Sequence, residues 1–238
     1  MSTKACALCR KETVLRISHI LPKFAQRRMK EMGRILSAAP GRKVYLPVQD
    51  FAKEKLLCAK CEQMLSSWES DAARIFNQRR TFDSPLLPEN LYYVNEGLPY
   101  HSTKLYLLSL LWRMSVSTLP DCREVELGPH AENIRRMLLA NDPGRAADYG
   151  CTLQVVIDSK GRIPVTRAAD RYRIEPAMVY YRLLLDGFLL TWFVGSEAAN
   201  RRGGMKDFFL QENGTWSSRV IHRNDVPFLR MALAGILE

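Results

Sequence analysis

The sequence predicts an α+β protein with a cysteine-rich N-terminal finger, a helical middle, and a C-terminal section of antiparallel β hairpins that ends in a helix. Three observations support this class. Two Cys-x-x-Cys pairs lie in the first 61 residues, apolar residues recur at helical spacing in the middle, and strand-like alternation begins at residue 151. The chain has 238 residues, 47% of them apolar, which is enough for one large or two small domains. Pro and Gly residues between positions 85 and 99 place a domain boundary there, dividing the chain into 1–84 and 85–238.

The finger is predicted from the pairs Cys6/Cys9 and Cys58/Cys61. A spacing of two residues lets one tight turn present both sulfurs to one metal ion, and two such turns complete the tetrahedral shell of a structural zinc site. The alternative is four buried cysteines without a common ligand, which would have to fall into this spacing by chance. We therefore expect these four thiolates to bind Zn²⁺.

The cysteines also bear on the cellular compartment. A disulfide framework is typical of short secreted chains, and the N-terminal sequence MSTKACALCRKE lacks the apolar core of a secretory signal. We expect a cytoplasmic protein in a reducing compartment. The longest apolar segments, 105–116 and 177–195, are interrupted by Arg113 and by Arg182 and Asp186, so no membrane span is expected.

Positive charge is concentrated in the first segment. Residues 1–60 contain fourteen Lys and Arg against four acidic residues, whereas residues 61–238 contain twenty-one of each sign. Concentrated basic charge attracts a polyanion and releases its condensed counterions on binding. A solvated helix face that only confers solubility is the alternative, but beside a zinc finger the nucleic-acid interpretation is favoured. We expect the contacts from seven residues: Lys23, Arg27, Arg28, Lys30, Arg34, Arg42 and Lys43.

Two helices are expected in the first segment. Pro22 is suited to the first turn of a helix that ends near Gly33. Residues 62–76 form an amphipathic pattern, so a second helix should grow out of the second cysteine pair. Glu62 and Glu69 are seven residues apart, which places them on nearly the same face of this helix. The expected elements follow the order of a treble-clef finger: a cysteine turn, a hairpin, a second cysteine turn and a helix.

The second segment is predicted to be a scaffold. Residues 103–117 are apolar nearly all round, as in a buried central helix, and Gly128-Pro129 begins a shorter one. The pairs Asp186-Gly187 and Asn213-Gly214 each separate two apolar strand patterns and predict two hairpins. Asp225 and Pro227 should begin the terminal helix. Alternation into a core, rather than a base-stacking platform, is the favoured explanation for six aromatic residues of these hairpins: Tyr180, Tyr181, Phe188, Trp192, Phe193 and Trp216.

The segments CALC, SHILPKF and LLCAKCEQMLSSWES resemble the zinc-knuckle branch of the HNH (His-Asn-His) endonucleases, whose ββα-metal finger is built on a treble clef. They resemble still more closely a set of bacterial proteins of uncertain function that share SHI-x-PKF and a Cys-x-x-Cys-Glu knuckle. The resemblance covers about residues 4–80, a third of the chain.

The resemblance implies a metal-dependent endonuclease. His19 matches the histidine that acts as general base on the attacking water. Glu62 takes the place of the asparagine that orients this histidine, and Glu69 lies near the last catalytic position, usually a metal-binding histidine or asparagine. Ser18 stands where an acidic or histidine metal ligand is common. Three of the four positions therefore depart from the family's pattern.

Phosphodiester hydrolysis needs a base, a hard divalent cation and a cationic surface. His19 is suited to be the base, and Glu62, Glu69 or Asp71 can offer carboxylate oxygens to Mg²⁺ or Mn²⁺. This ion would be separate from the zinc, because a four-cysteine shell has no open position. The alternatives are a structural or zinc-binding His19 and carboxylates that merely cover a helix surface.

The leading functional hypothesis is therefore an HNH-like endonuclease that cleaves nucleic acid, DNA rather than RNA, and that by family analogy acts in bacterial defence. Its alternatives are a catalytically inactive zinc-finger module that binds nucleic acid, and a finger that docks an acidic protein partner or a second copy in a homo-oligomer. The sequence has no P-loop, no dinucleotide-binding glycine pattern and no nucleophile elbow.

Overall fold

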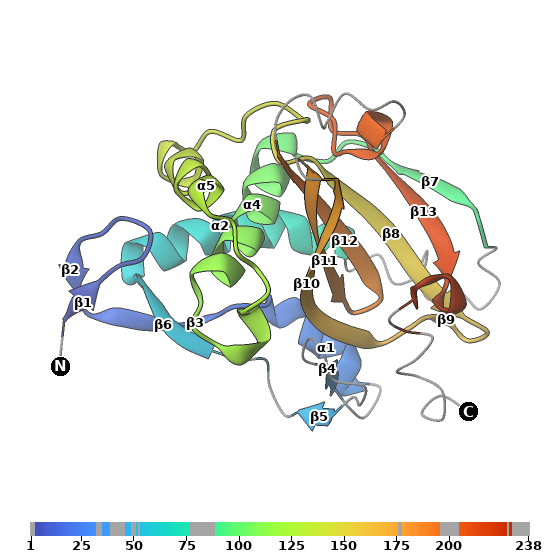
Figure 1. The fold of residues 1–238 in the computed structure, drawn as a ribbon, viewed down its shortest axis with the longest axis horizontal. Coiled ribbons are helices and arrows are strands. Elements are labelled where there is room, and N and C mark those ends of the chain that lie inside the picture. The colour runs from blue at the N-terminus through green and yellow to red at the C-terminus, as the bar shows by residue number, and fades with distance from the viewer. Residues whose placement is uncertain are drawn as a thin grey trace.

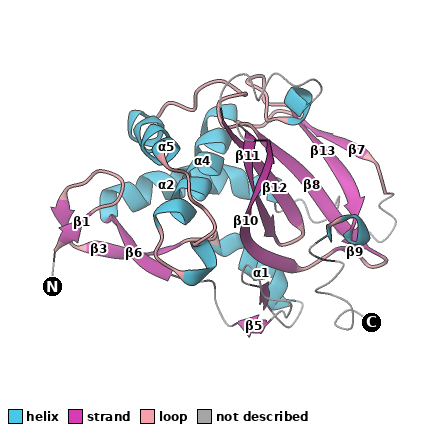
Figure 2. Ribbon diagram, viewed as in Figure 1, coloured by secondary structure: helices cyan, strands magenta, loops and turns pink. Residues whose placement is uncertain are grey.

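The computed structural model describes residues 3–31, 35–38, 46–48, 51, 53–76, 89–175, 178–195, 205–227 and 229. Within these ranges the chain forms four α-helices, a nine-stranded sheet and two smaller strand pairs (Figure 1). This is the mixed α+β class that the sequence predicts. Helices α2 (Ala59–Phe76), α4 (Tyr100–Val116) and α5 (Pro129–Ala140) gather on one side of the large sheet (Figure 2). None of the helices in the described part of the chain is both long and apolar enough to cross a bilayer.

The N-terminal region consists of short strands that lead into a long helix. Strands β1 (Lys4–Ala5) and β2 (Glu12–Thr13) pair around the first cysteine turn. Strand β3 (Leu15–His19) pairs antiparallel with β6 (Lys53–Cys58), and β6 continues directly into α2 (Ala59–Phe76). A β3–β6–α2 unit therefore carries the second cysteine pair at the junction of strand and helix.

The chain between β3 and β6 connects this unit to the rest of the protein. Helix α1 (Lys23–Glu31) follows β3, and β4 (Ile35–Ala38) then pairs with β5 (Leu46–Val48). Strand β4 also pairs with β10 of the large sheet. Strands from both sides of residue 84 thus share one sheet.

The large sheet has the order β5-β4-β10-β11-β12-β8-β13-β7, and β9 pairs with β8. Its further strands are β7 (Tyr92–Asn95), β8 (Cys151–Asp158), β9 (Gly161–Arg162), β10 (Val165–Glu175), β11 (Met178–Leu185), β12 (Phe188–Gly195) and β13 (Trp216–His222). The pairs β10–β4 and β13–β8 are parallel, so the expectation of an entirely antiparallel section is wrong. Both parallel pairs join segments that are distant in the chain, and no local sequence pattern reveals their direction.

The first predicted hairpin is confirmed. Strands β11 and β12 pair antiparallel along their whole length around Asp186 and Gly187. These two residues have φ angles of 50° and 78°, the left-handed conformation that a two-residue hairpin turn requires. A Cβ atom at Gly187 would lie 2.3 Å from the carbonyl oxygen of Ile163, so this position needs glycine for space as well as for backbone conformation.

The second predicted hairpin is wrong. A turn does form at Gly214, whose N–H donates to the Gln211 carbonyl at 2.9 Å. The segment before it forms the 3₁₀ helix η2 (Met205–Phe208) and a single bridge from Phe209 to Thr152, not a strand. Strand β13 instead lies between β8 and β7, which occupy both of its edges. Tertiary pairing has therefore replaced the local hairpin.

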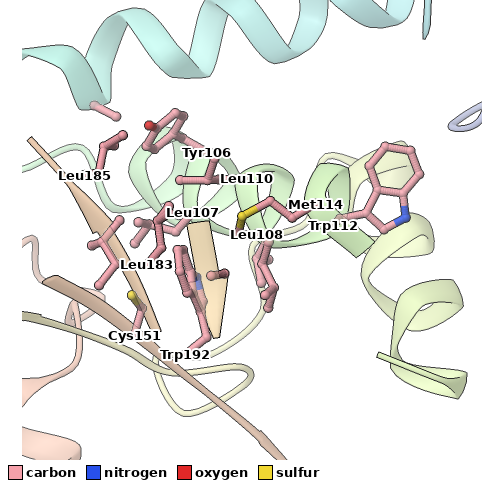
Figure 3. Close-up of a cluster of buried hydrophobic side chains, with 14 of the residues drawn as sticks. Tyr106, Leu107, Leu108, Leu110, Trp112, Met114, Cys151, Leu183, Leu185 and Trp192 are labelled. Atoms are coloured by element: carbon pink, nitrogen blue, oxygen red, sulfur yellow. The ribbon is translucent and has the colours of Figure 1, made fainter. Parts of the chain in front are cut away.

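Helix α4 (Tyr100–Val116) lies at the centre of the fold, and its residues from 102 to 114 are all buried. Figure 3 shows Leu107 of α4 beside Leu183 and Trp192 of the sheet, and Tyr106 beside Leu185. The apolar character of this helix on all sides follows from its position, because α2, α5 and the sheet surround it.

Helix α5 (Pro129–Ala140) begins at Pro129 and ends before Asn141, whose φ of 55° closes the helix in the left-handed conformation. The predicted start is confirmed. The helix expected from Asp225 onward falls almost entirely outside the described residues, which show only the short η3 (Arg223–Asp225) before it.

Candidate metal centre and the adjoining carboxylate cluster

The first cysteine pair is presented by a tight turn between β1 and β2. The Arg10 N–H donates to the Cys6 carbonyl at 2.8 Å, and the Cys6 N–H donates to the Lys11 carbonyl at 3.0 Å. Arg10 has a φ of 62°, which reverses the chain after Cys9. The second pair straddles the start of α2, with Cys58 as the last residue of β6 and Cys61 in the first turn of the helix.

The four sulfur atoms form one cluster, all within 4.8 Å of one another. The Cys9 and Cys58 sulfurs are 3.9 Å apart. Tetrahedral zinc with Zn–S bonds of about 2.3 Å needs sulfurs roughly 3.8 Å apart, so the arrangement fits a four-thiolate ion. The four cysteines that the sequence selects are therefore brought together, and they can hold a metal ion such as zinc.

Backbone groups prepare these sulfurs for negative charge. The Cys58 N–H donates to the Cys6 sulfur at 3.3 Å, and the Cys61 N–H donates to the Cys58 sulfur at 3.5 Å. Burial opposes ionisation of Cys58, yet hydrogen bonds from Cys61 and from the neighbouring thiols lower its pKa to about 7. Burial raises the pKa of Cys61. Metal binding must displace the protons that the cluster holds, so affinity will depend on pH.

Helix α5 fixes the first cysteine turn to the body of the protein. Arg135 donates to the Leu8 carbonyl at 2.6 Å, and Arg10 pairs with Glu132 at 2.5 Å. Hydrogen bonds from Arg135 lower the pKa of Glu132 to about 2. The Leu8 side chain, between the two cysteines, is fully buried. The cysteine cluster is thus attached to the main core.

The end of β3 carries Ser18 and His19 beside the start of α2. The buried Ser18 hydroxyl donates to the Glu62 carboxylate at 2.5 Å, although the two residues are 44 positions apart. On the paired strand, the Cα of Lys53 is opposite that of His19. The structure therefore joins Ser18 and Glu62 next to the cysteine cluster, and His19 follows Ser18 on the same strand.

Glu69 lies deeper and is held by two other groups. Arg113, in the last turn of α4, donates to the His19 carbonyl at 2.9 Å and pairs with Glu69 at 3.8 Å. Burial raises the pKa of Glu69, and the negative charge of Glu62 adds to this shift. Arg113 and the backbone N–H of Lys23, at the start of α1, act in the opposite direction. Glu69, on α2, thus contacts both α1 and α4, and these contacts favour a structural role for its carboxylate.

The sequence did not identify Arg113 as a residue of this site. Its side chain is only 4% exposed, and it connects the backbone of His19 to Glu69. The available signal was an arginine in a largely apolar helix, because a buried charge needs a partner. Asp71, the third carboxylate considered as a metal ligand, pairs with Arg74 at 2.5 Å.

Within the described ranges, the four cysteines are the only group of three or more Cys, His, Asp or Glu ligand atoms close enough to share an ion. His19, Glu62 and Glu69 lie in one neighbourhood but do not form such a group in this arrangement.

Only part of the predicted basic surface can be placed. Lys23 and Lys30 are exposed on α1. Arg27 and Arg28 belong to the same helix, but their side chains fall outside the description, as do Arg34, Arg42 and Lys43 entirely. The β3–β6 pair adds three exposed cations that sequence reasoning did not select: Arg16, Lys53 and Lys55.

Comparison with known proteins adds no further constraint. The chain matches no protein-family model, no curated protein and no solved structure. The functional argument therefore depends on the site itself.

Proposed function

We propose that the protein is a metal-dependent, HNH-like endonuclease that hydrolyses phosphodiester bonds of nucleic acid, DNA rather than RNA. The observation that supports this proposal is the contact of Ser18 with Glu62 beside the cysteine cluster, on the β3–β6–α2 unit that also carries His19 at the end of β3. We interpret this unit as a treble-clef finger of the ββα-metal type. A zinc ion at its base would hold the strand end and the helix start in fixed register.

The proposed reaction is a hydrolysis in which His19 acts as general base. Its imidazole takes a proton from water while the water oxygen forms a bond to phosphorus. The bond from phosphorus to the leaving sugar oxygen breaks, and this oxygen acquires a proton from solvent. The products are a phosphate monoester and a sugar hydroxyl.

Mg²⁺ or Mn²⁺, when bound, supplies the positive charge that offsets the charge developing on the leaving oxygen. Glu62 is the carboxylate best placed to hold such an ion, because the hydroxyl of Ser18, the residue before His19, fixes one of its oxygens. We assign Glu69 a positioning role through Arg113, which holds the His19 carbonyl.

The cations around this site are suited to hold the nucleic-acid backbone. Lys23, Lys53, Lys55 and Arg16 are exposed on α1 and on the β3–β6 pair. Each phosphate contact that such residues make should add about 0.9 to the slope of log affinity against log salt for duplex DNA. A role in bacterial defence is an extension of the proposal that depends on family analogy.

A second candidate is a catalytically inactive zinc module that binds nucleic acid. It is favoured by the contacts of Glu69 with Arg113 and with the Lys23 N–H, and by the single metal-ligand cluster of the described residues. In this case the carboxylates only stabilise the fold, and binding remains.

The deciding experiment is cleavage of supercoiled plasmid, single-stranded DNA and RNA by zinc-loaded protein with added Mg²⁺ or Mn²⁺. His19→Ala and Glu62→Gln are compared with wild type, and His101→Ala is the matched control, because His101 is an exposed histidine on α4. Loss of a general base should reduce the rate by about 10²- to 10⁴-fold. The control should keep full activity.

The outcome of this experiment distinguishes the nuclease from the catalytically inactive zinc module. Cleavage that is lost in both site variants, with unchanged zinc content and circular dichroism, supports the nuclease. Absence of cleavage by wild type, with salt-sensitive DNA binding retained, supports the inactive module. Absence of binding as well would reject both and point to an acidic protein partner.

A further inference from the structure

The face of the large sheet that points away from α4 carries a second site. On β12, Trp192 packs into the core against α4, so the alternating neighbours Thr191 and Phe193 face the opposite side (Figure 3). This outer face holds a cavity of about 220 Å³. Its lining comes from five strands and from η2: Tyr92, Thr152, Leu153, Gln154, Arg182, Thr191, Phe193, Met205, Phe208 and Arg219.

Only one half of this outer face is closed by packing. Val156, Leu184, Leu189 and Ile221 form a separate apolar cluster there with residues such as Val226. The half with the cavity is different, because Tyr92 and Met205 are 55% and 43% exposed. Large side chains with that exposure around a cavity are suited to contact a ligand.

Aromatic rings lie on both sides of this cavity. Tyr172 and Tyr180 stack with centroids 5.1 Å apart, and Tyr180 lies 6.0 Å from Phe193. On the other side of the cavity, Tyr92 lies 5.7 Å from Phe208. Rings arranged in this way offer flat apolar surfaces to a planar ligand.

Two arginines supply positive charge among these rings. The Arg182 guanidinium lies 5.0 Å from the Tyr180 ring and 5.1 Å from the Tyr172 ring, and it forms no ion pair or hydrogen bond with any residue the structure describes. Arg219 is exposed, lies 6.0 Å from the Tyr92 ring, and donates to the neutral Asn90 side chain at 2.6 Å. Among the residues that the structure describes, no carboxylate pairs with either guanidinium.

The acidic group beside Arg182 is already paired. Asp170, opposite Arg182 on the neighbouring strand, forms an ion pair with Arg167 at 2.8 Å. None of the described residues that line the cavity is acidic. The cavity is therefore cationic, partly aromatic and supplied with neutral donors and acceptors from Gln154 and Thr191.

We infer that this cavity binds a nucleoside phosphate. The planar base stacks on the tyrosine and phenylalanine rings, Gln154 and Thr191 hydrogen-bond its edge, and Arg182 and Arg219 hold the phosphate. The same chemistry has two sources, a free nucleotide or one nucleotide of a single strand that crosses the sheet. The inference does not depend on the nuclease proposal, because this site faces away from the helices that carry Glu62 and Arg113.

The test measures binding without added Mg²⁺ or Mn²⁺, so that cleavage plays no part. AMP, ATP and inorganic phosphate are titrated by calorimetry, and a fluorescein-labelled oligo-dT strand by fluorescence polarisation. The variants are Arg182→Gln and Arg219→Gln. Arg171→Gln is the matched control, because Arg171 is an exposed sheet arginine that pairs with Glu126 outside the cavity.

We expect wild type to bind a nucleotide or the strand, and each cavity variant to lose at least about tenfold in affinity, while the control changes less than about twofold. Arg219 is exposed, so its variant tests the site even if Arg182→Gln disturbs folding. A strand bound about 100-fold tighter than AMP identifies single-stranded nucleic acid as the source, and equal or tighter AMP binding identifies free nucleotide. The inference is overturned if nothing binds, if phosphate binds as well as AMP, or if a strand keeps its affinity in both variants.

Discussion

The contact of Arg113 with Glu69 and the His19 carbonyl gives the sharpest prediction for stability. Arg113→Met removes a charge-assisted hydrogen bond of 2.9 Å, which contributes about 1.5–3 kcal/mol, and leaves the Glu69 carboxylate buried beside Glu62. Breaking a buried pair by removing one partner costs about 3–5 kcal/mol. We expect a loss of about 3–5 kcal/mol in the free energy of unfolding at pH 8.

The loss should depend on pH and on Glu69. The pKa of Glu69 is raised above its ordinary value of 4.5 in the folded protein, and removal of Arg113 should raise it further. A folded carboxyl with a raised pKa holds its proton more tightly than the unfolded one, so stability falls as pH rises through that window. The cost of Arg113→Met should therefore be smaller at pH 5.5 than at pH 8. Glu69→Gln in the same chain should recover about 1–3 kcal/mol.

Urea unfolding of the zinc-saturated proteins, followed by tryptophan fluorescence, measures these differences in a double-mutant cycle. Zinc content is determined for each variant, so that metal loss is not counted as side-chain energy. The reasoning is refuted if Arg113→Met costs the same at both pH values, or if Glu69→Gln gives no relief.

Three further predictions follow from single sites. Cys58→Ser should abolish zinc binding and lower the melting temperature steeply, because structural zinc supplies on the order of 10 kcal/mol of folding free energy. Metal analysis measures the zinc content, and Cys122→Ser is the control variant, which should keep its zinc. Gly187→Ala should lower the free energy of unfolding by at least about 2 kcal/mol, since the φ of Gly187 is 78° and its Cβ would lie 2.3 Å from a carbonyl oxygen. Gly97→Ala should cost only about 1 kcal/mol, because Gly97 has a similar φ of 67° but no atom within 4 Å of the added Cβ. Equal melting temperatures for the two variants would contradict a steric requirement for glycine at position 187. Burial lowers the pKa of Lys104 to about 8, below the ordinary lysine pKa of 10.5. Between these two pH values the unfolded chain binds more protons than the folded protein, so the free energy of unfolding should rise with pH. Lys104→Met should flatten that rise in urea unfolding, and an unchanged slope would contradict this prediction.

Local sequence signals predicted the features that local geometry decides. The cysteine spacing predicted the sulfur cluster, and Asp186-Gly187 predicted the β11–β12 turn, because in both cases adjacent residues determine the conformation. Asn213-Gly214 carries the same turn signal, but the partners of β13 come from β8 and β7, which no pattern near residue 213 encodes.

The candidate site was only partly predictable for a related reason. His19 and Glu62 were selected by the resemblance of their segments to a known family, and the structure shows a contact of Glu62 with Ser18, the residue before His19. The contact of Arg113 with Glu69 and His19 links helices and a strand 44 and 94 residues apart, so only the three-dimensional packing reveals it. The sequence also did not distinguish the positions of the hairpin aromatic residues. Tyr181 and Trp192 are buried in the core, whereas Tyr180, next to Tyr181, lies on the outer face of the sheet, near the cavity.

The order of strands in the large sheet has a consequence for synthesis of the chain. Its two outer parts, β5–β4 and β7, are complete by residue 95, whereas the strands between them come from residues 151–222. During translation, these outer strands are therefore synthesised roughly ten seconds before β13, the strand that joins β7 to the centre of the sheet. During that interval β7 has no neighbour for its backbone hydrogen bonds, and such an unpaired edge promotes association between chains. Nascent chains halted before β13 should consequently depend on chaperones and aggregate when released without them.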